Sequence, residues 1–230
     1  METISRKIRE VSERIACACA AAGRAVPSVT LLAVSKSQSA DAVRAALAAG
    51  QHRFGENYVQ EGLAKIAALA EQRAQIEWHY IGALQSNKAG AVAQAFDWVH
   101  SVDRLKIAER LSQQRAAAAS PLQVCLQVNV SGEASKGGVA PSELQALAAA
   151  VAALPRERLV LRGLMAIPEP TADPAAMRLP HRALHELSAG LRRQGLALDT
   201  LSMGMSADLE AAILEGATVV RVGSAIFGSR

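Results

Sequence analysis

Short apolar runs alternate along the chain with longer stretches of helical periodicity. The first run, Leu31–Val34, follows Val29-Thr30 and is apolar on both faces, which is typical of a strand buried in a parallel sheet. This run is followed closely by a lysine, Lys36. Before it, apolar residues at helical spacing between Ile4 and Ile15 predict a packed N-terminal helix.

The alternation of strand and helix continues to the end of the chain. We expect further strands at residues 53–55, 77–81, 98–101, 122–130, 159–167, 198–203 and 218–222. The expected helices between them span residues 40–50, 58–73, 87–95, 103–118, 141–154, 174–195 and 207–216, with a turn or short helix at 223–230.

Eight alternations of strand and helix predict an α/β fold, a single (β/α)8 TIM-type barrel over residues 1–230 with an extra N-terminal helix. The alternative is a doubly wound open sheet. Such a sheet normally carries a glycine-rich dinucleotide turn after its first strand, and Ser35–Gln38 contains no glycine. The closed barrel is therefore the expected architecture.

Composition and charge narrow the possible functions. The 230 residues carry a net charge of +4, but the basic residues are dispersed and only 3% of residues are aromatic, which argues against nucleic-acid binding. The cysteines lack zinc-ligand spacing and fit a reducing cytoplasm. The longest apolar run, 146–154, is far shorter than the ~20 residues that a membrane span needs.

Polar residues gather where the predicted strands end. In a barrel, the C-terminal ends of all strands meet at one mouth, where active sites form. The residues expected there are Lys36, Glu56-Asn57, Gln85–Lys88, Ser101 with Asp103, Asn129–Ser131, Ser202–Ser206, Arg221 and Gly223-Ser224. The barrel therefore predicts one site built from segments far apart in the sequence.

The last clusters in the chain predict a phosphate site. Loops after strands seven and eight of such barrels commonly bind phosphate, and Ser202–Ser206 and Gly223-Ser224 occupy these positions. Gly204 and Gly223 permit close approach of the backbone, and the serines add hydroxyl donors. The alternative is that both glycines are ordinary turn residues and Ser206 is a helix N-cap.

Lys36 and Arg221 add the remaining chemistry. An amine at the rim of an apolar sheet is poorly solvated and a better nucleophile toward a carbonyl, unless it simply extends into water. Arg221 interrupts an apolar strand, where a guanidinium needs an acceptor. A Schiff-base lysine, a phosphate cradle and a fixed arginine together suit pyridoxal 5'-phosphate (PLP). An arginine opposite the ring nitrogen would donate to it and leave the pyridine neutral, which weakens carbanion chemistry.

Other candidate residues have simpler interpretations. His181 and His185 are four apart and could share a metal, but no third ligand is evident, so we expect two surface histidines. Lys136 lies in a glycine-containing loop, as a second amine or a solvated side chain. Glu56 could serve as an acid or base, whereas Asp103 is better explained as a helix cap.

Several long motifs follow one another in order along the chain. They are Val34–Lys36, Phe54–Glu61, Trp78–Gly82 with Leu84–Lys88, Ser101–Arg104, Gly163–Pro168, Leu201–Ser206 and Val220–Gly228. Together they resemble the YggS/PROSC family of pyridoxal phosphate homeostasis proteins over nearly the whole chain. Ser39, Tyr80 and Ala83 depart from the family pattern, which affects the conformation of two mouth loops rather than the cofactor site.

The resemblance implies a PLP fold type III barrel, similar to the N-terminal domain of alanine racemase, with PLP bound as a Schiff base on Lys36. By the same resemblance Arg221 faces the ring nitrogen. The other implied cofactor-binding residues are Ser206, Gly223 and Ser224 at the phosphate, and Asn57, Ser202, Met203 and Gly204 around the ring.

The resemblance also gives the leading functional hypothesis. It implies a cytoplasmic carrier or buffer of PLP in intracellular homeostasis, with no catalytic residue. We expect a monomer that holds PLP covalently on Lys36, with PLP-dependent apo-enzymes as candidate recipients and no nucleic-acid or membrane partner. The alternative is a PLP-dependent amino acid racemase or lyase of low activity, with Lys36 as one base and Lys136 or Tyr58 as the second.

Overall fold

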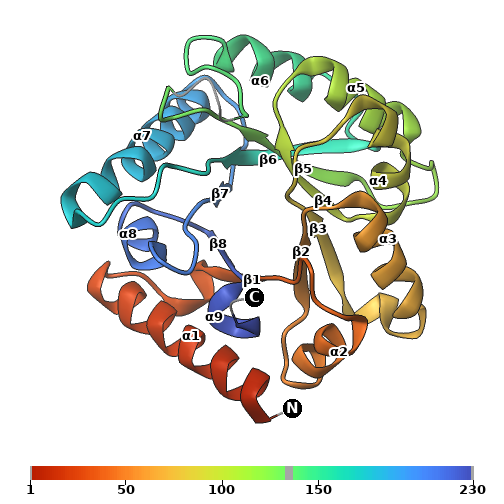
Figure 1. Ribbon diagram of the computed structural model, residues 1–230. Coiled ribbons are helices and arrows are strands. Elements are labelled where there is room, and N and C mark those ends of the chain that lie inside the picture. The colour runs from red at the N-terminus through yellow and green to blue at the C-terminus, as the bar shows by residue number, and fades with distance from the viewer. Residues whose placement is uncertain (1, 133–136, 229–230) are drawn as a thin grey trace.

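The computed structural model describes residues 2–132 and 137–228, and within them the chain forms a closed barrel (Figure 1). Each strand pairs in parallel with the next, and β8 pairs with β1 through Thr30–Val219 to Ala33–Val222. The strands are β1 Thr30–Val34, β2 Arg53–Glu56, β3 Glu77–Tyr80, β4 Trp98–Val102, β5 Leu122–Gln127, β6 Leu159–Met165, β7 Thr200–Ser202 and β8 Val219–Val222. The predicted TIM-type barrel is confirmed.

Helices form a ring around the barrel (Figure 1). They are α1 Glu2–Ala21, α2 Ala40–Ala48, α3 Val59–Ala68, α4 Ala89–Ala95, α5 Leu105–Gln114, α6 Leu144–Ala152, α7 Pro174–Arg193, α8 Leu209–Leu214 and α9 Ser224–Phe227. Short 3-10 turns occur at Val26–Ser28, Ala70–Gln75 and Ser86–Lys88. None of the helices in the described part of the chain combines the length and the apolar character that crossing a membrane requires.

The N-terminal helix α1 lies outside the strand–helix repeat. Its apolar stripe, which includes Ile8, Val11 and Ile15, is buried as its spacing predicts. The helix packs against α8, α9 and α2. On its outer side Arg14 forms a two-pronged ion pair with Glu210 of α8, at 2.7 and 2.9 Å. The stripe and this pair fix α1 against the last elements of the barrel.

Side chains alternate between the barrel interior and the helical layer, because successive residues of a strand point to opposite faces. Leu32, Val34 and Val219 form a small buried cluster with Ile81 that is separate from the main core. Trp78 and Phe54 belong to the main core that lies under the helices, with ring centroids 5.9 Å apart. By this alternation Arg221, two residues after Val219, also faces the interior.

Several helices are shorter than their patterns predict. The helix expected over 58–73 ends at Ala68 and continues as a 3-10 turn. The helix expected over 103–118 spans Leu105–Gln114, and Asp103 is not its N-cap but pairs with Arg104 at 2.6 Å. The helix expected from 207 begins at Leu209 after the N-cap position Asp208, so Ser206 is not a cap.

Gly163 lies where β6 and β7 pack so closely that a side chain has no room. A Cβ at this position would lie 1.7 Å from the carbonyl oxygen of Thr200, its partner in β7. We therefore expect Gly163→Ala to lower the free energy of unfolding by about 3 kcal/mol, measured by urea denaturation. Gly190→Ala is the matched control, because its Cβ would make only an ordinary contact, 3.9 Å from Arg193 Nη2, within α7 and should stabilise by up to about 1 kcal/mol. An equal effect of the two substitutions would contradict this account.

Candidate functional site

Lys36 lies in the turn directly after β1, at the C-terminal mouth of the barrel. Its side chain is exposed, and its amine has no hydrogen-bond or ion-pair partner among the described residues. The expectation that this amine is poorly solvated is therefore wrong for the structure as it stands. The predicted position of Lys36 is confirmed, because its amine, unpaired among the described residues, lies at the C-terminal mouth of the barrel.

A buried ionic cluster holds the backbone on both sides of Lys36. The Lys65 ammonium, only 5% exposed, donates to the Ser35 carbonyl at 2.5 Å and contacts Glu56 at 2.8 Å and Glu61 at 2.6 Å. Glu61 in turn accepts the backbone N–H of Ser37, a residue in the left-handed conformation with φ 61°. The turn that carries Lys36 is thus fixed from beneath by α3.

Glu56 belongs to this cluster and does not face the mouth. Its side chain lies between β2 and α3, where Oε1 accepts from the Ser35 hydroxyl at 2.5 Å and from Lys65. Burial raises the pKa of Glu56, although hydrogen bonds from Lys65 and Ser35 oppose the shift. The structure assigns Glu56 to the support of the Lys36 turn and not to acid–base chemistry in the barrel.

Arg221 projects into the barrel and has the acceptors that its burial demands. Its side chain is 4% exposed, Nη1 donates to the Ser202 hydroxyl at 2.8 Å, and Nη2 donates to the Ala166 carbonyl at 2.8 Å. Burial lowers the pKa of Arg221 to about 10, so the guanidinium stays charged at neutral pH. A fixed cation therefore lies inside the mouth, as its interruption of an apolar strand predicts.

The loops after β7 and β8 meet at a pair of hydroxyls. Ser206 and Ser224 lie 3.2 Å apart, Oγ to Oγ, and the short helices α8 and α9 follow the two loops. Gly204 has φ +89°, and a Cβ there would lie 2.5 Å from Ala212. A Cβ at Gly223 would lie 3.2 Å from the Val34 carbonyl oxygen, which places β8 beside the strand that leads to Lys36.

His181 shapes the loop after β7. Its ring is fully buried and Nε2 lies 3.0 Å from Asp208, whose other oxygen accepts the backbone N–H of Met205 at 2.6 Å. His185 is half-buried and its Nδ1 contacts the Glu215 carbonyl at 3.0 Å. The prediction of two surface histidines is wrong, because α7 packs its histidine face onto α8. No group of metal ligands occurs among the described residues.

Asn57 follows β2 and lies at the inner side of the mouth. Within the described residues its Oδ1 is buried without a hydrogen-bond partner. The neighbouring backbone is tightly packed, since a Cβ on Gly82 would lie 2.0 Å from the Asn57 carbonyl oxygen. Asn57 therefore carries an unsatisfied acceptor just after the C-terminal end of β2.

Other predicted mouth residues stand apart from this centre. The Ser101 hydroxyl donates to the Gly82 carbonyl at 2.5 Å and serves the loop rather than the mouth. Asn129 receives the backbone N–H of Gly132 within its own loop. Lys88 ends a 3-10 turn and lines a cavity of about 330 Å³ that Asn57 and Tyr58 also line. Lys136 lies outside the described residues.

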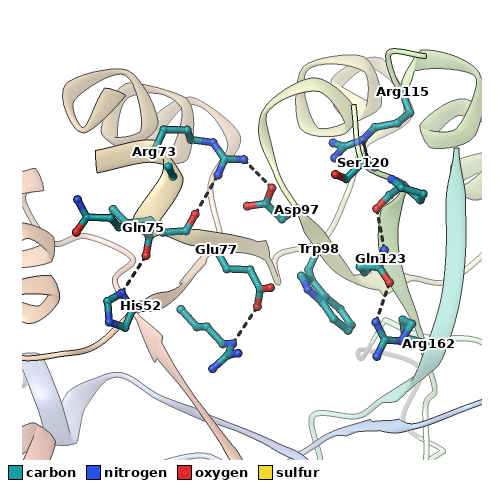
Figure 2. A pocket seen from close by; sticks show the side chains of 14 residues that line it. His52, Arg73, Gln75, Glu77, Asp97, Trp98, Arg115, Ser120, Gln123 and Arg162 are labelled. Atoms are coloured by element: carbon teal, nitrogen blue, oxygen red, sulfur yellow. Dashed lines mark hydrogen bonds and ion pairs between the residues drawn. The ribbon is translucent and has the colours of Figure 1, made fainter. Parts of the chain in front are cut away.

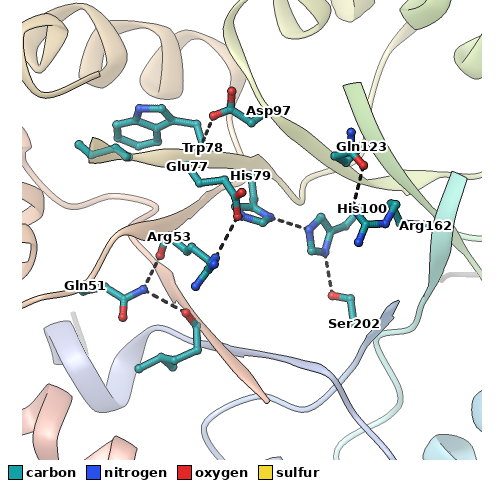
Figure 3. Close-up of polar contacts among 12 residues, drawn as sticks. Gln51, Arg53, Glu77, Trp78, His79, Asp97, His100, Gln123, Arg162 and Ser202 are labelled. Carbon is teal, nitrogen blue, oxygen red and sulfur yellow. Dashed lines mark hydrogen bonds and ion pairs between the residues drawn. The ribbon is translucent and has the colours of Figure 1, made fainter. Parts of the chain in front are cut away.

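Two buried histidines in the barrel interior escaped the sequence reasoning. His79 Nδ1 lies 2.8 Å from His100 Nε2, and His100 Nδ1 lies 2.7 Å from the Ser202 hydroxyl (Figure 3). At the other end His79 Nε2 lies 2.9 Å from Glu77. Burial lowers the pKa of His79 and lowers that of His100 well below its usual value. Polar residues two apart on buried strands, Glu77 with His79, were the available signal.

A second hollow lies at the opposite, N-terminal end of the barrel (Figure 2). It has a volume of about 730 Å³, and its charged lining consists of Arg53, Arg73, Arg115, Arg162, Glu77 and Asp97. The arginines are occupied: Arg73 binds Asp97 at 2.6 Å, and Arg162 is bonded to Gln123 and Asp199. Because this end of a barrel serves stability, the candidate site remains at the mouth with Lys36.

Comparison with known proteins gives consistent matches. The family model for the alanine racemase N-terminal domain matches residues 12–230. A pyridoxal phosphate homeostasis protein from Pseudomonas aeruginosa is 60% identical over 100% of this chain and 97% of its own length. A protein of the same name from Escherichia coli K12 is 50% identical over 100% of this chain and 98% of its own length.

Solved structures agree with the sequence matches. PipY of Synechococcus elongatus, in a structure with PLP bound, has a TM-score of 0.81 and 39% identity over 95% of this chain and 100% of that chain. Alanine racemase of Corynebacterium glutamicum is 17% identical, with a TM-score of 0.73 over 100% of this chain and 62% of its own, and shares the fold alone. The chain therefore belongs to the alanine racemase N-terminal domain family and, within it, to the pyridoxal phosphate homeostasis proteins.

Proposed function

We propose that this protein binds PLP at the barrel mouth as a single-domain carrier or buffer in intracellular PLP homeostasis, without catalytic turnover. One observation carries the proposal: the ends of β1, β7 and β8 bring together a free amine, a hydroxyl pair and a buried guanidinium. Lys36, Ser206 with Ser224, and Arg221 supply them. The names of the homologues and the PLP in PipY support the same function.

The residues at the mouth fit PLP chemically. The aldehyde of the cofactor can react with an amine, its phosphate accepts from hydroxyl and amide donors, and its pyridine nitrogen accepts from one further donor. The buried Asn57 Oδ1 without a partner is the kind of atom that a bound ligand satisfies. Gly204 and Gly223 pack closely against Ala212 and Val34, so a side chain at either position would displace the loops after β7 and β8 that carry the two serines.

We assign each residue one task. Lys36 would hold the cofactor covalently, and Ser206, Ser224 and the backbone of Gly223 would bind the phosphate. Asn57 and the segment Ser202–Gly204 would line the ring. When bound, PLP supplies an aldehyde whose bond to an amine is reversible, and this property lets a carrier take it up and release it.

Arg221 explains why such a site would carry rather than catalyse. The guanidinium has no acceptor atom, so toward the ring nitrogen it can only donate. A ring nitrogen that does not take up a proton leaves the pyridine neutral and a weaker electron sink. Its two fixed hydrogen bonds, to Ser202 and Ala166, hold the guanidinium in place.

A racemase or lyase would need a second base on the opposite face of the ring. Tyr58, one of the two candidates, is 56% exposed, and its hydroxyl has no partner among the described residues. The other candidate, Lys136, lies outside them. Exchange of the amino acid α-proton in deuterated water separates the hypotheses, because the carrier is expected to show no catalytic exchange. Multiple turnovers per protein molecule would establish the enzyme instead.

The proposal is tested by adding PLP to the purified protein and recording its absorbance. We expect the wild type to gain the band of a lysine-bound cofactor, and Lys36→Ala to lack it completely while folding normally by circular dichroism. Lys106→Ala is the matched control, because Lys106 is exposed on α5, in the helical layer outside the barrel, and should keep the band. A wild type that stays colourless with excess PLP would overturn the proposal.

The proposed cellular setting is the cytoplasm. The described cysteines, Cys17, Cys19 and Cys125, are all free thiols, which agrees with a reducing compartment. We further propose that PLP-dependent apo-enzymes receive the cofactor from a monomer. Transfer is measured by mixing the loaded protein with an apo-enzyme and following loss of the band.

A further inference from the structure

A continuous chain of hydrogen bonds crosses the barrel interior from Arg221 to Glu77. It starts at Arg221, which donates to the Ser202 hydroxyl. From Ser202 it continues through His100 and His79 and ends on the Glu77 carboxylate (Figure 3). Each donor–acceptor distance along it lies between 2.7 and 2.9 Å. TIM barrels usually fill this space with branched apolar side chains, so a polar chain here calls for an explanation.

The Glu77 end fixes the direction of the first bonds. Burial alone would raise the pKa of Glu77, but its contacts with His79 and Arg53 lower it to about 2, so the group is an anion that only accepts. His79 Nε2 must therefore carry the proton. Because His79 is neutral, its Nδ1 is an acceptor, and His100 Nε2 must donate to it.

The same reasoning carries to the mouth. His100 is also neutral, so its Nδ1 accepts and the Ser202 hydroxyl must donate its proton there. This leaves the lone pairs of the Ser202 oxygen for the Arg221 N–H group. Every hydrogen bond in this series is then donated in the direction from Arg221 to Glu77. Each proton of the series is donated to a single acceptor. The hydrogen bonds cannot run in the opposite direction, because the Glu77 carboxylate has no proton to donate to His79.

Packing holds the two imidazole rings in these orientations. The indole of Trp98 stacks on His79, with centroids 5.4 Å apart and an interplanar angle of 14°. His100 meets His79 edge-on at 5.1 Å. Both histidines are 2% exposed or less. A ring flip of either histidine would break two hydrogen bonds inside the barrel.

We propose that His79 and His100 are positioning residues of the cofactor site: by accepting the Ser202 hydroxyl proton they leave the Ser202 oxygen to accept from Arg221, and so hold the guanidinium in place toward the mouth. The inference rests on the proposed function, in which Arg221 faces the ring nitrogen of PLP. Because all these hydrogen bonds are donated toward Glu77, they do not pass a proton from Glu77 to Arg221. The PLP ring nitrogen is therefore not protonated through the barrel interior.

The direction of the chain is measured on the unloaded wild-type protein by nitrogen-15 NMR of the histidine side chains. We expect His79 and His100 to show a proton on Nε2 and an unprotonated Nδ1 at neutral pH, with signals assigned from His79→Asn and His100→Asn. A proton on Nδ1 of either ring, or a charged imidazolium, would overturn the inference. This measurement does not depend on PLP binding.

The effect on the cofactor is measured by PLP titration of His100 variants. His100→Leu removes the acceptor of Ser202, and we expect about tenfold weaker PLP binding and a shifted absorbance band. His100→Asn keeps an acceptor oxygen near the Nδ1 position and should recover most of both. His185→Leu, a histidine bonded outside the chain, should leave both unchanged.

These outcomes separate the possible failures. A purely structural role for His100 would lower the thermal midpoint without moving the band or distinguishing Asn from Leu, and that result overturns the inference. An unchanged dissociation constant and band in His100→Leu overturns it as well. A wild type that takes up no PLP overturns the proposed function, and the NMR result then still decides the direction of the chain.

Discussion

Replacing Lys65 with methionine is expected to lower the free energy of unfolding by about 3–5 kcal/mol, because it leaves a buried carboxylate without its cation. Glu56 is 0% exposed, and Lys65 is its only ion-pair partner among the described residues. Methionine fills a similar volume, so the loss is electrostatic rather than a cavity. Urea denaturation at pH 7 measures the change.

A second substitution isolates the charge effect. In the double variant Lys65→Met with Glu56→Gln, the buried charge is gone and the Ser35 hydroxyl still finds an acceptor. We expect the double variant to recover most of the loss, so that the two substitutions are strongly non-additive. Lys106→Met, on the exposed face of α5, is the control and should change stability by less than about 0.5 kcal/mol. Additive losses would refute the pairing.

The same substitution reaches the cofactor site. Lys65 holds the Ser35 carbonyl, and Glu61 holds the Ser37 N–H, so the cluster fixes the turn on either side of Lys36. A turn released from α3 has more conformations to lose when PLP binds. We therefore expect Lys65→Met to weaken PLP binding at temperatures where it is still folded, whereas Lys106→Met leaves it unchanged.

Strands such as β1 and β5 could be predicted because buried parallel strands are largely apolar runs. The face of α3 could be predicted only in part. Its apolar spacing indicates Val59, Leu63, Ile66 and Leu69 as the buried face. Val59 and Leu69 are buried, but Leu63 and Ile66 are only partly buried, while Gly62 and Lys65 are buried beside them. A Cβ on Gly62 would lie 2.7 Å from the Phe96 ring. Close approach at this glycine turns the helix so that Lys65 reaches Glu56, and sequence spacing alone does not show it.

Part of the candidate site could be predicted from the sequence and part of it could not. Lys36, Ser224 and Arg221 could be found because the ends of parallel strands must meet at one edge. The hydrogen bonds between Arg221 and Glu77 inside the barrel could not be predicted. The sequence does not show whether a histidine in a strand faces the barrel interior or the helices. His100 finds its partners on β3 and β7, and only the closed barrel brings those strands to it.

Lowering the pH from 6.5 to 5 is expected to destabilise the protein steeply. His79 and His100 have pKa values below the ordinary 6.5 because burial disfavours the charged ring. Below pH 6.5 the unfolded chain binds protons that the folded chain does not, so the free energy of unfolding falls with pH. The loss continues down to the folded pKa of each ring. Each histidine contributes up to about 1.4 kcal/mol per pH unit.

Glu77 and Glu56 do not produce the same pH dependence of the free energy of unfolding as the two histidines. The pKa of Glu77 is lowered to about 2, so its stabilising contribution is lost only below its ordinary value of 4.5. Glu56 has a raised pKa, and its contribution is lost as the pH rises above 4.5, which has the opposite sign. Both groups remain in His100→Leu, so a comparison of that variant with the wild type cancels them.

The measurement is urea denaturation of wild type and His100→Leu at several pH values between 5 and 6.5. The wild-type slope should exceed that of the variant by up to about 1.4 kcal/mol per pH unit, the share of one buried histidine. Equal slopes would mean that His100 takes up a proton in the folded barrel. A proton on His100 would occupy the nitrogen that receives the Ser202 hydroxyl, and the hydroxyl would then have to turn away from it. The pH slope therefore tests by thermodynamics the neutral ring on which the direction of the interior chain depends.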